Sequence, residues 1–227
     1  GVGLLEAGDR LEQPEFHALY EAMPQGFRAE LIGGIVHMPS PVKLPHSRVQ
    51  TRAILWLDQF EQATPGTECL LTPSVVPGGN SEPEPDAVLR ILPSHGGASW
   101  DEDNYLTGVP ELFVEVSSST AGFDLGEKRA AYEQAGVPEY LVLLERQRQA
   151  RWFVLEDGKY IELVMDDAGV MKSRIFPGLW LLPEALFSGD KRRVREVLQA
   201  GTSSEKHGEF TTKLAAGRQA SSDGEAG

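Results

Sequence analysis

The sequence predicts an α/β (α+β) fold in which a mixed central β-sheet is flanked by helices. Short apolar runs bounded by proline and glycine indicate strands, and apolar residues at helical spacing indicate helices. The two kinds of segment alternate in the order helix, hairpin, helix, three strands, helix, strand and hairpin. Such an order favours one domain with helices on the faces of a sheet.

The first part of the chain carries a helix, a hairpin, a long helix and a strand. Phe16 and Tyr20 recur at helical spacing in the first helix, and Trp56 and Phe60 lie on the apolar face of the second. Gly33-Gly34 is typical of a two-residue hairpin loop, because glycine tolerates positive φ. We expect the first helix over 13–23, the hairpin over 27–38, the second helix over 46–62 and the strand over 70–76.

The second part opens with two short apolar strands, Pro83–Leu89 and Leu112–Ser117, each of which carries an acid. The polar loop between them, 93–108, is long enough to be a mobile or functional element. Asp124 and Glu127 have the spacing of a capping box, so a helix is expected to begin there and to end at Gly136. The remaining elements are a strand over 139–145, a hairpin over 151–164 and a helix over 183–200.

The composition is that of an ordinary globular protein, with 41% hydrophobic and 24% charged residues among 227. We expect a single domain over residues 1–200, followed by a disordered tail over 201–227, where small and polar residues dominate. No apolar run is long enough for a membrane span, and the start does not resemble a secretory signal. The single cysteine, Cys69, excludes an internal disulfide and a cysteine-based zinc site, so we expect a cytoplasmic protein.

The formal net charge of −13 argues against a protein that grips nucleic acid by a broad basic face. It does not exclude a nuclease, because the charge of a local cleft can differ from the average and a bound metal ion adds positive charge.

Two acids in apolar strands are the main chemical signal. Asp86 stands where its strand begins, and Glu115 lies inside a run that is otherwise expected to be buried. A buried carboxylate is costly unless it is paired or bound to a metal. If the two strands are neighbours, both acids can meet at one end and hold one hard cation such as Mg²⁺ or Mn²⁺. The pair therefore predicts a metal-dependent hydrolase.

Lys128 is the candidate cation for such a site, because it lies early in the helix that follows Glu115. Asp124, Lys128 and Tyr132 succeed one another at i, i+4 and i+8 on one helix face. The alternative is a surface ion pair between Asp124 and Lys128, which contributes little. Glu30, in the first hairpin, is a third acid; alternation alone can also point it to solvent.

With Glu30, Asp86, Glu115 and Lys128 in view, the chain resembles the small stand-alone restriction endonuclease family of the PD-(D/E)XK nuclease superfamily. The resemblance runs from about Pro14 to Tyr160. The matching pieces are Ala29–Gly34, Pro45-His46, Pro85–Val88, Glu115–Ser117, Asp124, Lys128, Tyr132 and Gly136–Tyr140.

The resemblance implies a restriction endonuclease-like fold around a mixed four-stranded sheet. It also implies Asp86 and Glu115 as ligands of Mg²⁺ or Mn²⁺, the Val116 carbonyl as a third ligand, and Glu30 as a helper of the metal site. The superfamily pattern has lysine two residues after the glutamate, where this chain has Ser117. In this subgroup the lysine is expected on the following helix, which fits Lys128.

Four further residues are candidates for substrate contacts. Arg48 and Arg52 lie one turn apart on the second helix, Arg90 follows the Asp86 strand, and Tyr132 follows Lys128. A solvated helix face is the alternative for the arginine pair. The five histidines have no metal-ligand spacing with one another. His46, at a helix start, either serves the site or is structural, and His37 is expected on a sheet face.

The leading hypothesis is a divalent-metal-dependent endonuclease that hydrolyses phosphodiester bonds of DNA. An inactive nuclease-fold module for binding or assembly is the first alternative, motivated by the acidic charge and by Ser117. A metal-assisted hydrolase of a small phosphorylated substrate is the second. Exposed strand edges of a small sheet suggest a homodimer, which would also suit cutting both strands of a duplex.

Overall fold

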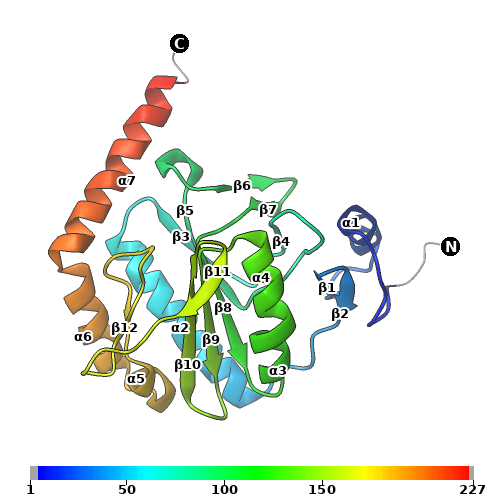
Figure 1. Ribbon diagram of the computed structural model, residues 1–227, viewed down its shortest axis with the longest axis horizontal. Coiled ribbons are helices and arrows are strands. Elements are labelled where there is room, and N and C mark those ends of the chain that lie inside the picture. The colour runs from blue at the N-terminus through cyan, green and yellow to red at the C-terminus, as the bar shows by residue number, and fades with distance from the viewer. Residues whose placement is uncertain (1–4, 225–227) are drawn as a thin grey trace.

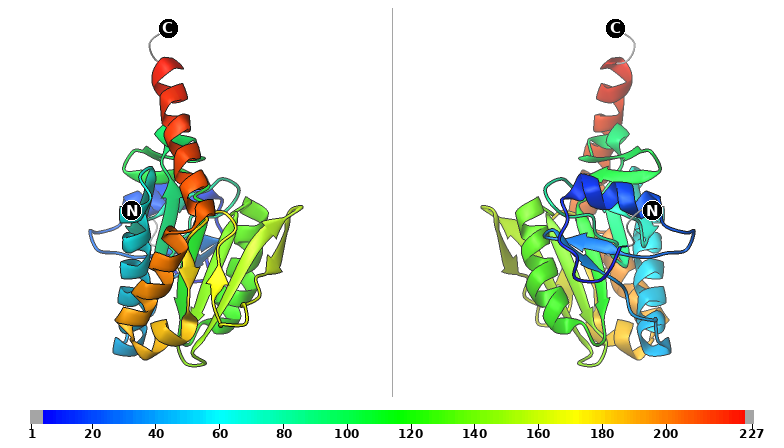
Figure 2. Two further views of the ribbon diagram at one scale, coloured as in Figure 1. Left: turned by 90° about the vertical axis from the view of Figure 1, so that its left-hand side faces the viewer. Right: turned by 90° about the vertical axis from the view of Figure 1, so that its right-hand side faces the viewer.

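The computed structural model of the protein describes residues 5–224 and has three layers, with helices on both faces of a central sheet (Figure 1). The long helix α2 (Leu44–Ala63) covers one face, and α4 (Arg129–Ala135) covers the other. A small hairpin with helix α1 (Gln13–Glu21) lies to one side, and the C-terminal helices α6 and α7 lie to the other (Figures 1 and 2). This is the mixed sheet flanked by helices that the sequence predicts.

The main sheet has six strands in the order β11-β10-β9-β8-β5-β3. Its strands are β3 (Thr67–Leu71), β5 (Ala87–Ile91), β8 (Leu112–Ser117), β9 (Glu139–Leu144), β10 (Gln149–Glu156) and β11 (Lys159–Glu162). Only the β8–β9 pair is parallel, and the other neighbours are antiparallel. The parallel pair requires a crossover, which the helical segment from 121 to 135 supplies.

The remaining elements are short or peripheral. They are β1 (Glu30–Ile32), β2 (Ile35–His37), β4 (Val75–Val76), β6 (Ser99–Glu102), β7 (Tyr105–Gly108), β12 (Met171–Lys172), β13 (Trp180–Leu181), α3 (Ala121–Phe123), α5 (Pro183–Ser188), α6 (Lys191–Thr202) and α7 (Glu205–Gly224). A 3₁₀ turn covers Pro93–His95, and a π-helical segment, Asp124–Lys128, joins α3 to α4.

Strand alternation divides the core into two halves. On the α2 face, Leu112, Val114 and Val116 of β8 pack with the apolar side of the helix, including Trp56 and Phe60. On the α4 face, the intervening β8 residue Phe113 packs against Tyr132 of α4 at a ring distance of 4.8 Å. Both faces of β8 are therefore buried, and Glu115 belongs to the α4 face by the same alternation.

The predicted hairpin is present as β1 and β2, closed by Gly33 and Gly34 with positive φ. Its strand β1 makes a bridge between Leu31 and Glu82, with reciprocal backbone hydrogen bonds of 2.8 and 3.0 Å. This bridge places Glu30 beside the segment that leads into β5, although the two are separated by more than 50 residues.

Several predicted elements differ in detail from the structure. The strand expected over 70–76 is two strands, β3 and β4, which belong to different sheets. The 93–108 segment is not a plain loop, because β6 and β7 pair with β4 in a separate three-stranded sheet. The single helix expected over 183–200 is two helices, α5 and α6. The chain turns between them at Gly189, whose φ of +79° is accessible to glycine.

The outer edge of β11 is partly closed by a side chain. The amide of Tyr160 donates to Glu133 of α4 at 2.7 Å, and Lys159 pairs with the same carboxylate. A strand edge whose outward amide is already bonded is a poorer template for a second chain. The homodimer expected from exposed edges stays a prediction. Within residues 5–224, no helix is long and apolar enough to cross a membrane.

The C-terminal segment departs most from expectation. Over residues 201–224, where a disordered tail is predicted, the chain completes α6 and forms α7, while residues 225–227 lie outside the described part. His207 and Leu214 are buried, and Phe210 contacts Phe176 of the core at 6.2 Å. These anchors fall at i, i+3 and i+7, so a helical period exists. Glycine, threonine and charged residues between the anchors hide it in the sequence.

His207 makes the docking of α7 sensitive to acid. Its Nε2 lies 2.9 Å from Thr64 Oγ1, and burial lowers the pKa of the imidazole below its usual value of 6.5. Because the unfolded chain takes up the proton more readily, stability is lost as pH falls from about 6.5 to the lowered folded pKa. We expect the free energy of unfolding to decrease between pH 7.5 and 5.5, measured by urea unfolding.

The control for this prediction is His207→Gln, which keeps a polar contact to Thr64 but does not titrate in this range. The variant is expected to be less stable than the wild type at pH 7.5 and to change less between pH 7.5 and 5.5. Equal pH dependence in the two proteins would assign the acid sensitivity to other groups.

Candidate active site

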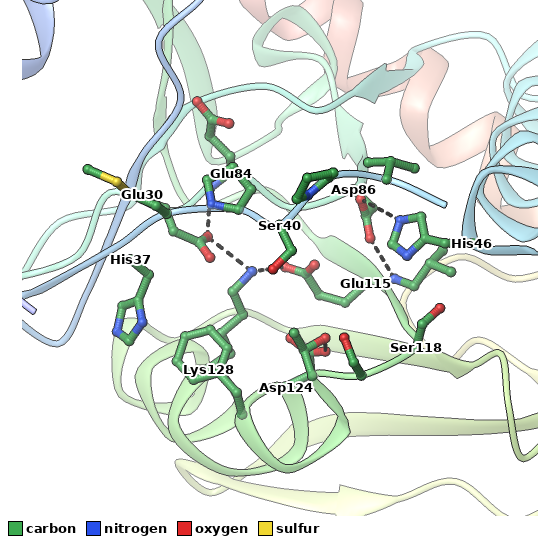
Figure 3. Close-up of a pocket in the computed structure, with 18 of the residues that line it drawn as sticks. Glu30, His37, Ser40, His46, Glu84, Asp86, Glu115, Ser118, Asp124 and Lys128 are labelled. Atoms are coloured by element: carbon green, nitrogen blue, oxygen red, sulfur yellow. Dashed lines mark hydrogen bonds and ion pairs between the residues drawn. The ribbon is translucent and has the colours of Figure 1, made fainter. Parts of the chain in front are cut away.

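A cleft of about 730 Å³ opens between the β1–β2 hairpin, the start of α2, the ends of β5 and β8, and the π-helical segment (Figure 3). Its inner wall carries four carboxylates and one lysine, namely Glu30, Asp86, Glu115, Asp124 and Lys128. The structure therefore brings the four residues predicted for the catalytic centre to one place. It also adds a fifth charged group, Asp124.

The sheet register explains why Asp86 and Glu115 meet. Strands β5 and β8 are antiparallel neighbours, with Ala87 opposite Val114. Continuing this register by one residue brings Asp86 opposite Glu115. Both residues belong to the α4 face by alternation, so both side chains leave the sheet in the same direction. The condition set by the sequence, that the two acidic strands be neighbours, is met.

Asp86 is held by contacts to each of its oxygens. The backbone N–H of Val116 donates to Oδ2 at 2.7 Å, and the Gln50 amide donates to Oδ1 at 3.0 Å. His46 Nε2 lies 3.6 Å from Oδ1. The pKa of His46 is raised above its usual value, chiefly by its contact with Asp86, while burial acts in the opposite direction.

Glu115 is fixed by Lys128 and Tyr132, which both reach its Oε1 at 2.9 Å. Lys128 Nζ also lies 3.0 Å from Glu30 Oε2, so the ammonium bridges two carboxylates (Figure 3). Glu30 in turn accepts the backbone N–H of Glu84 at 3.3 Å. Lys128 therefore points at the acids, as the sequence-based site requires, and the surface ion pair with Asp124 is not what the structure shows.

Burial and an excess of negative charge shift the pKa values of Glu115 and Lys128. Burial raises the pKa of Glu115, as do the nearby carboxylates Asp86, Asp124 and Glu30, whereas Lys128 lowers it. Burial alone would lower the pKa of Lys128, but Glu115, Glu30 and Asp124 outweigh it, so this pKa is raised. Lys128 accordingly stays protonated at physiological pH and acts as a fixed cation.

Asp124 is not the helix cap that its spacing with Glu127 predicts. The helix begins three residues earlier, at Ala121, and Asp124 is the first residue of the π-helical segment, where Thr120 donates to its Oδ2 at 2.6 Å. The wider π turn carries Asp124 and Lys128, both buried and both on the cleft. Irregular turns of this type are frequent at functional sites.

Val116 and Ser117 follow Glu115 on β8. Val116 lines the cleft, and its N–H is the group that holds Asp86. Ser117, two residues after Glu115, is buried, and its hydroxyl lies 3.4 Å from that of Thr120. Ser117 therefore contacts the turn between β8 and α3, and the ammonium group comes from Lys128.

The arginines proposed for substrate contacts do not line the cleft. Arg52 donates to the carbonyls of Leu186 and Phe187 at the end of α5. Arg90 is four residues along β5 from Asp86, roughly 13 Å at the rise of a strand, and it pairs with Glu68 and Asp101. Arg48 is exposed on another side of α2. Tyr132 reaches Glu115 but is buried beneath it.

Other residues take the places that the arginines were expected to fill. Exposed Arg28, Lys43 and Arg146 line the outer part of the cleft, and Arg28 pairs with Glu84 at 2.9 Å. The histidines His37 and His46 also line it. No spacing rule identifies this set, because its members come from four separate segments. The Pro45-His46 helix start was the one usable signal.

A second acidic cluster lies outside this cleft. Asp58 and Glu61 of α2 and Cys69 of β3 have ligand atoms within 4.8 Å of one another. Burial raises the pKa of the Cys69 thiol to about 12, so it stays protonated, and Glu61 is already bonded to the Cys69 N–H at 2.8 Å. A protonated thiol is a poor metal ligand.

The layered mixed sheet is a restriction endonuclease-like fold. A crystal structure of "a putative nuclease belonging to DUF820" from Anabaena variabilis ATCC 29413 is similar to this chain, with a TM-score of 0.59 and 13% sequence identity. The match covers 75% of this chain and 96% of that chain, and at this identity it shows the fold alone. No curated protein matches the chain significantly.

The family is shown by the sequence itself. The chain belongs to the Uma2 family, described as "Putative restriction endonuclease", whose model matches residues 13–184. Membership in this family supports a nuclease function. The helices α6 and α7 lie beyond the matched region.

Proposed function

We propose that the protein is a divalent-metal-dependent endonuclease that hydrolyses phosphodiester bonds of DNA. The observation that carries the proposal is the convergence of Asp86, Glu115, Glu30 and Lys128 on one cleft. Four residues from three distant parts of the sequence meet there, and a nuclease of this superfamily needs acids for a metal and an ammonium group at such a point.

The residues fit a divalent cation. Four carboxylates on the inner wall face a single ammonium group, and burial, together with the neighbouring carboxylates, raises the pKa of Glu115. Hard oxygen donors of this kind suit Mg²⁺ or Mn²⁺. We assign Asp86 and Glu115 as ligands, with the Val116 carbonyl as a further oxygen on the same wall.

The chain's own groups have distinct roles in this proposal. A bound cation would supply a water of lowered pKa and positive charge at the phosphoryl oxygens. Lys128, held by Glu30 and Glu115, presents a permanent positive charge to a phosphate in the cleft. Tyr132 fixes the Glu115 carboxylate from below, and Gln50 with the Val116 amide fixes Asp86.

The outer cleft offers cations to a nucleic acid backbone. Lys43 and Arg146 are exposed at the cleft, on a chain whose net charge is −13. Because these exposed cations are few, we expect DNA binding to be weak and to decrease strongly as the salt concentration rises.

The test is a cleavage assay with the purified wild type on supercoiled plasmid, linear duplex and single-stranded DNA. We expect nicking or cutting in 1 to 10 mM MnCl₂, roughly the range in which weak sites fill, and none in excess EDTA. RNA and a panel of nucleotides are the comparison substrates. Hydrolysis of nucleotides alone would indicate a small-substrate hydrolase, and absence of any cleavage would leave an inactive nuclease-fold module.

A further inference from the structure

His46 lies at the proposed metal site, where its ring faces the Asp86 carboxylate. Its ring points into the cleft, and Nε2 is 3.6 Å from Asp86 Oδ1, which is too long for a hydrogen bond (Figure 3). The side chains of His46 and Asp86 are 18% and 17% exposed, so both open onto the cleft. At this distance the ring nitrogen and the carboxylate oxygen can both contact one ion that lies to the side of the line joining them.

The start of α2 directs two side chains at the same carboxylate. His46 and Gln50 stand at i and i+4, on one face of the helix, and both point at Asp86 Oδ1. Gln50 already donates to Oδ1, and the Val116 amide donates to Oδ2. Asp86 therefore has its structural hydrogen bonds without His46, and each oxygen keeps a lone pair for a ligand.

We propose that His46 Nε2 is a protein ligand of the divalent cation, together with Asp86 and Glu115. This inference rests on the proposed metal site. Two donor atoms that each lie about 2.1 Å from one ion are separated by about 3.0 to 3.4 Å at octahedral to tetrahedral angles. The observed 3.6 Å between His46 and Asp86 is therefore within a few tenths of an ångström of the separation of two ligand atoms on one ion.

The ligand set has a consequence for metal choice. Carboxylates alone suit Mg²⁺, whereas an imidazole nitrogen favours transition metals such as Mn²⁺ over Mg²⁺. His46 thus selects Mn²⁺ within the pair of ions that the acids allow. Replacement of a group that only orients a metal ligand weakens binding about 10- to 100-fold, so loss of a direct ligand is expected to weaken Mn²⁺ binding at least about 10-fold. The effect on Mg²⁺ is expected to be smaller.

The test is pulsed electron paramagnetic resonance of Mn²⁺ bound to the full-length protein, which detects nitrogen nuclei coordinated to the ion. Wild type is expected to show the modulation of one imidazole ¹⁴N, and this signal should change to that of ¹⁵N when histidine is labelled. His46→Asn is expected to lose the modulation and at least about 10-fold in Mn²⁺ affinity by calorimetry. His37→Asn, which changes the other histidine on the cleft, is the matched control and should retain both.

The outcomes separate this inference from the proposed function. Manganese bound to wild type without imidazole modulation overturns the ligand assignment, even if DNA is cleaved. Imidazole modulation without DNA cleavage supports the assignment and contradicts the nuclease proposal. Absence of Mn²⁺ binding by wild type overturns both. The labelled wild type gives the answer without depending on how well a variant folds.

Discussion

Replacement of Asp86 by asparagine is expected to reduce Mn²⁺-dependent DNA cleavage by at least about 10³-fold. The side chain keeps its shape and can still accept the Val116 N–H, but the negative charge proposed to bind the cation is lost. A catalytic metal supplies several kcal/mol of transition-state stabilisation, and each 1.4 kcal/mol corresponds to a factor of ten in rate. Initial rates of plasmid nicking at saturating DNA measure the effect.

Glu84→Gln is the matched control for this experiment. Glu84 stands two residues before Asp86 and is also on the cleft, but it is bonded to Arg28 and Tyr20. Its replacement is expected to leave the cleavage rate within about threefold while lowering the unfolding midpoint slightly, since exposed pairs contribute about 0 to 1 kcal/mol. Cleavage that survives Asp86→Asn unchanged would point to a contaminating enzyme or to a different site.

The signal that located Glu115, an acid inside an apolar strand, is ambiguous in principle. Glu139 is also an acid in an apolar strand, where it is the first residue of β9, and it is fully buried. Its carboxylate accepts from the Trp152 indole at 3.0 Å, the Ser173 hydroxyl at 2.8 Å and the amides of Arg174 and Ile175. Burial raises the pKa of Glu139, and these donors lower it. This acid joins β9 to the segment 173–175 and does not line the cleft of the candidate active site.

Alternation separates the two acids, but only once the register is known. Glu139, Leu141 and Leu143 of β9 point to the α2 face, whereas Glu115 of β8 points to the α4 face and the cleft. A one-residue change of register exchanges the faces. The sequence fixes alternation within each strand but not which face borders a cavity. The partners of Glu139 lie more than 30 residues away, except Trp152, and no local pattern indicates them.

Elements with strong local periodicity could be predicted, and contacts between distant segments could not. The helix around Trp56 and Phe60, the Gly33-Gly34 hairpin and the capacity of Lys128 to reach Glu115 follow from spacing along the chain. The arginines predicted to contact substrate do not line the cleft. The charge of a residue and its position on a helix do not show which other residues it packs against. Arg52 is used by α5, which is 134 residues away. The π-helical turn at Asp124 was missed because its residues also satisfy the pattern of a capping box.

Lys128→Met is expected to destabilise the protein by about 3–5 kcal/mol and to abolish most cleavage. Lys128 and Glu115 are both buried, and removal of one partner leaves an uncompensated carboxylate. Burial already raises the pKa of Glu115, and loss of Lys128 raises it further. Since a raised folded pKa of an acid destabilises the native state above that pKa, the deficit should shrink as pH falls toward the unfolded value near 4.5. Urea unfolding at pH 8 and pH 5.5 measures it.

The charge-matched double variant Lys128→Met/Glu115→Gln separates stability from activity. The neutral amide can still accept from Tyr132, whose hydroxyl lies 2.9 Å from Glu115 Oε1, and the carboxylate that loses Lys128 is then Glu30, which is 14% exposed. It is therefore expected to recover most of the lost stability and to lose the steep pH dependence, because replacing both partners of a buried pair is often neutral. Cleavage is not expected to recover, because the double variant lacks both the Glu115 carboxylate that is proposed to bind the metal and the Lys128 ammonium group. If Lys128→Met were as stable as the wild type at pH 8 and equally active, the ammonium group would have neither role.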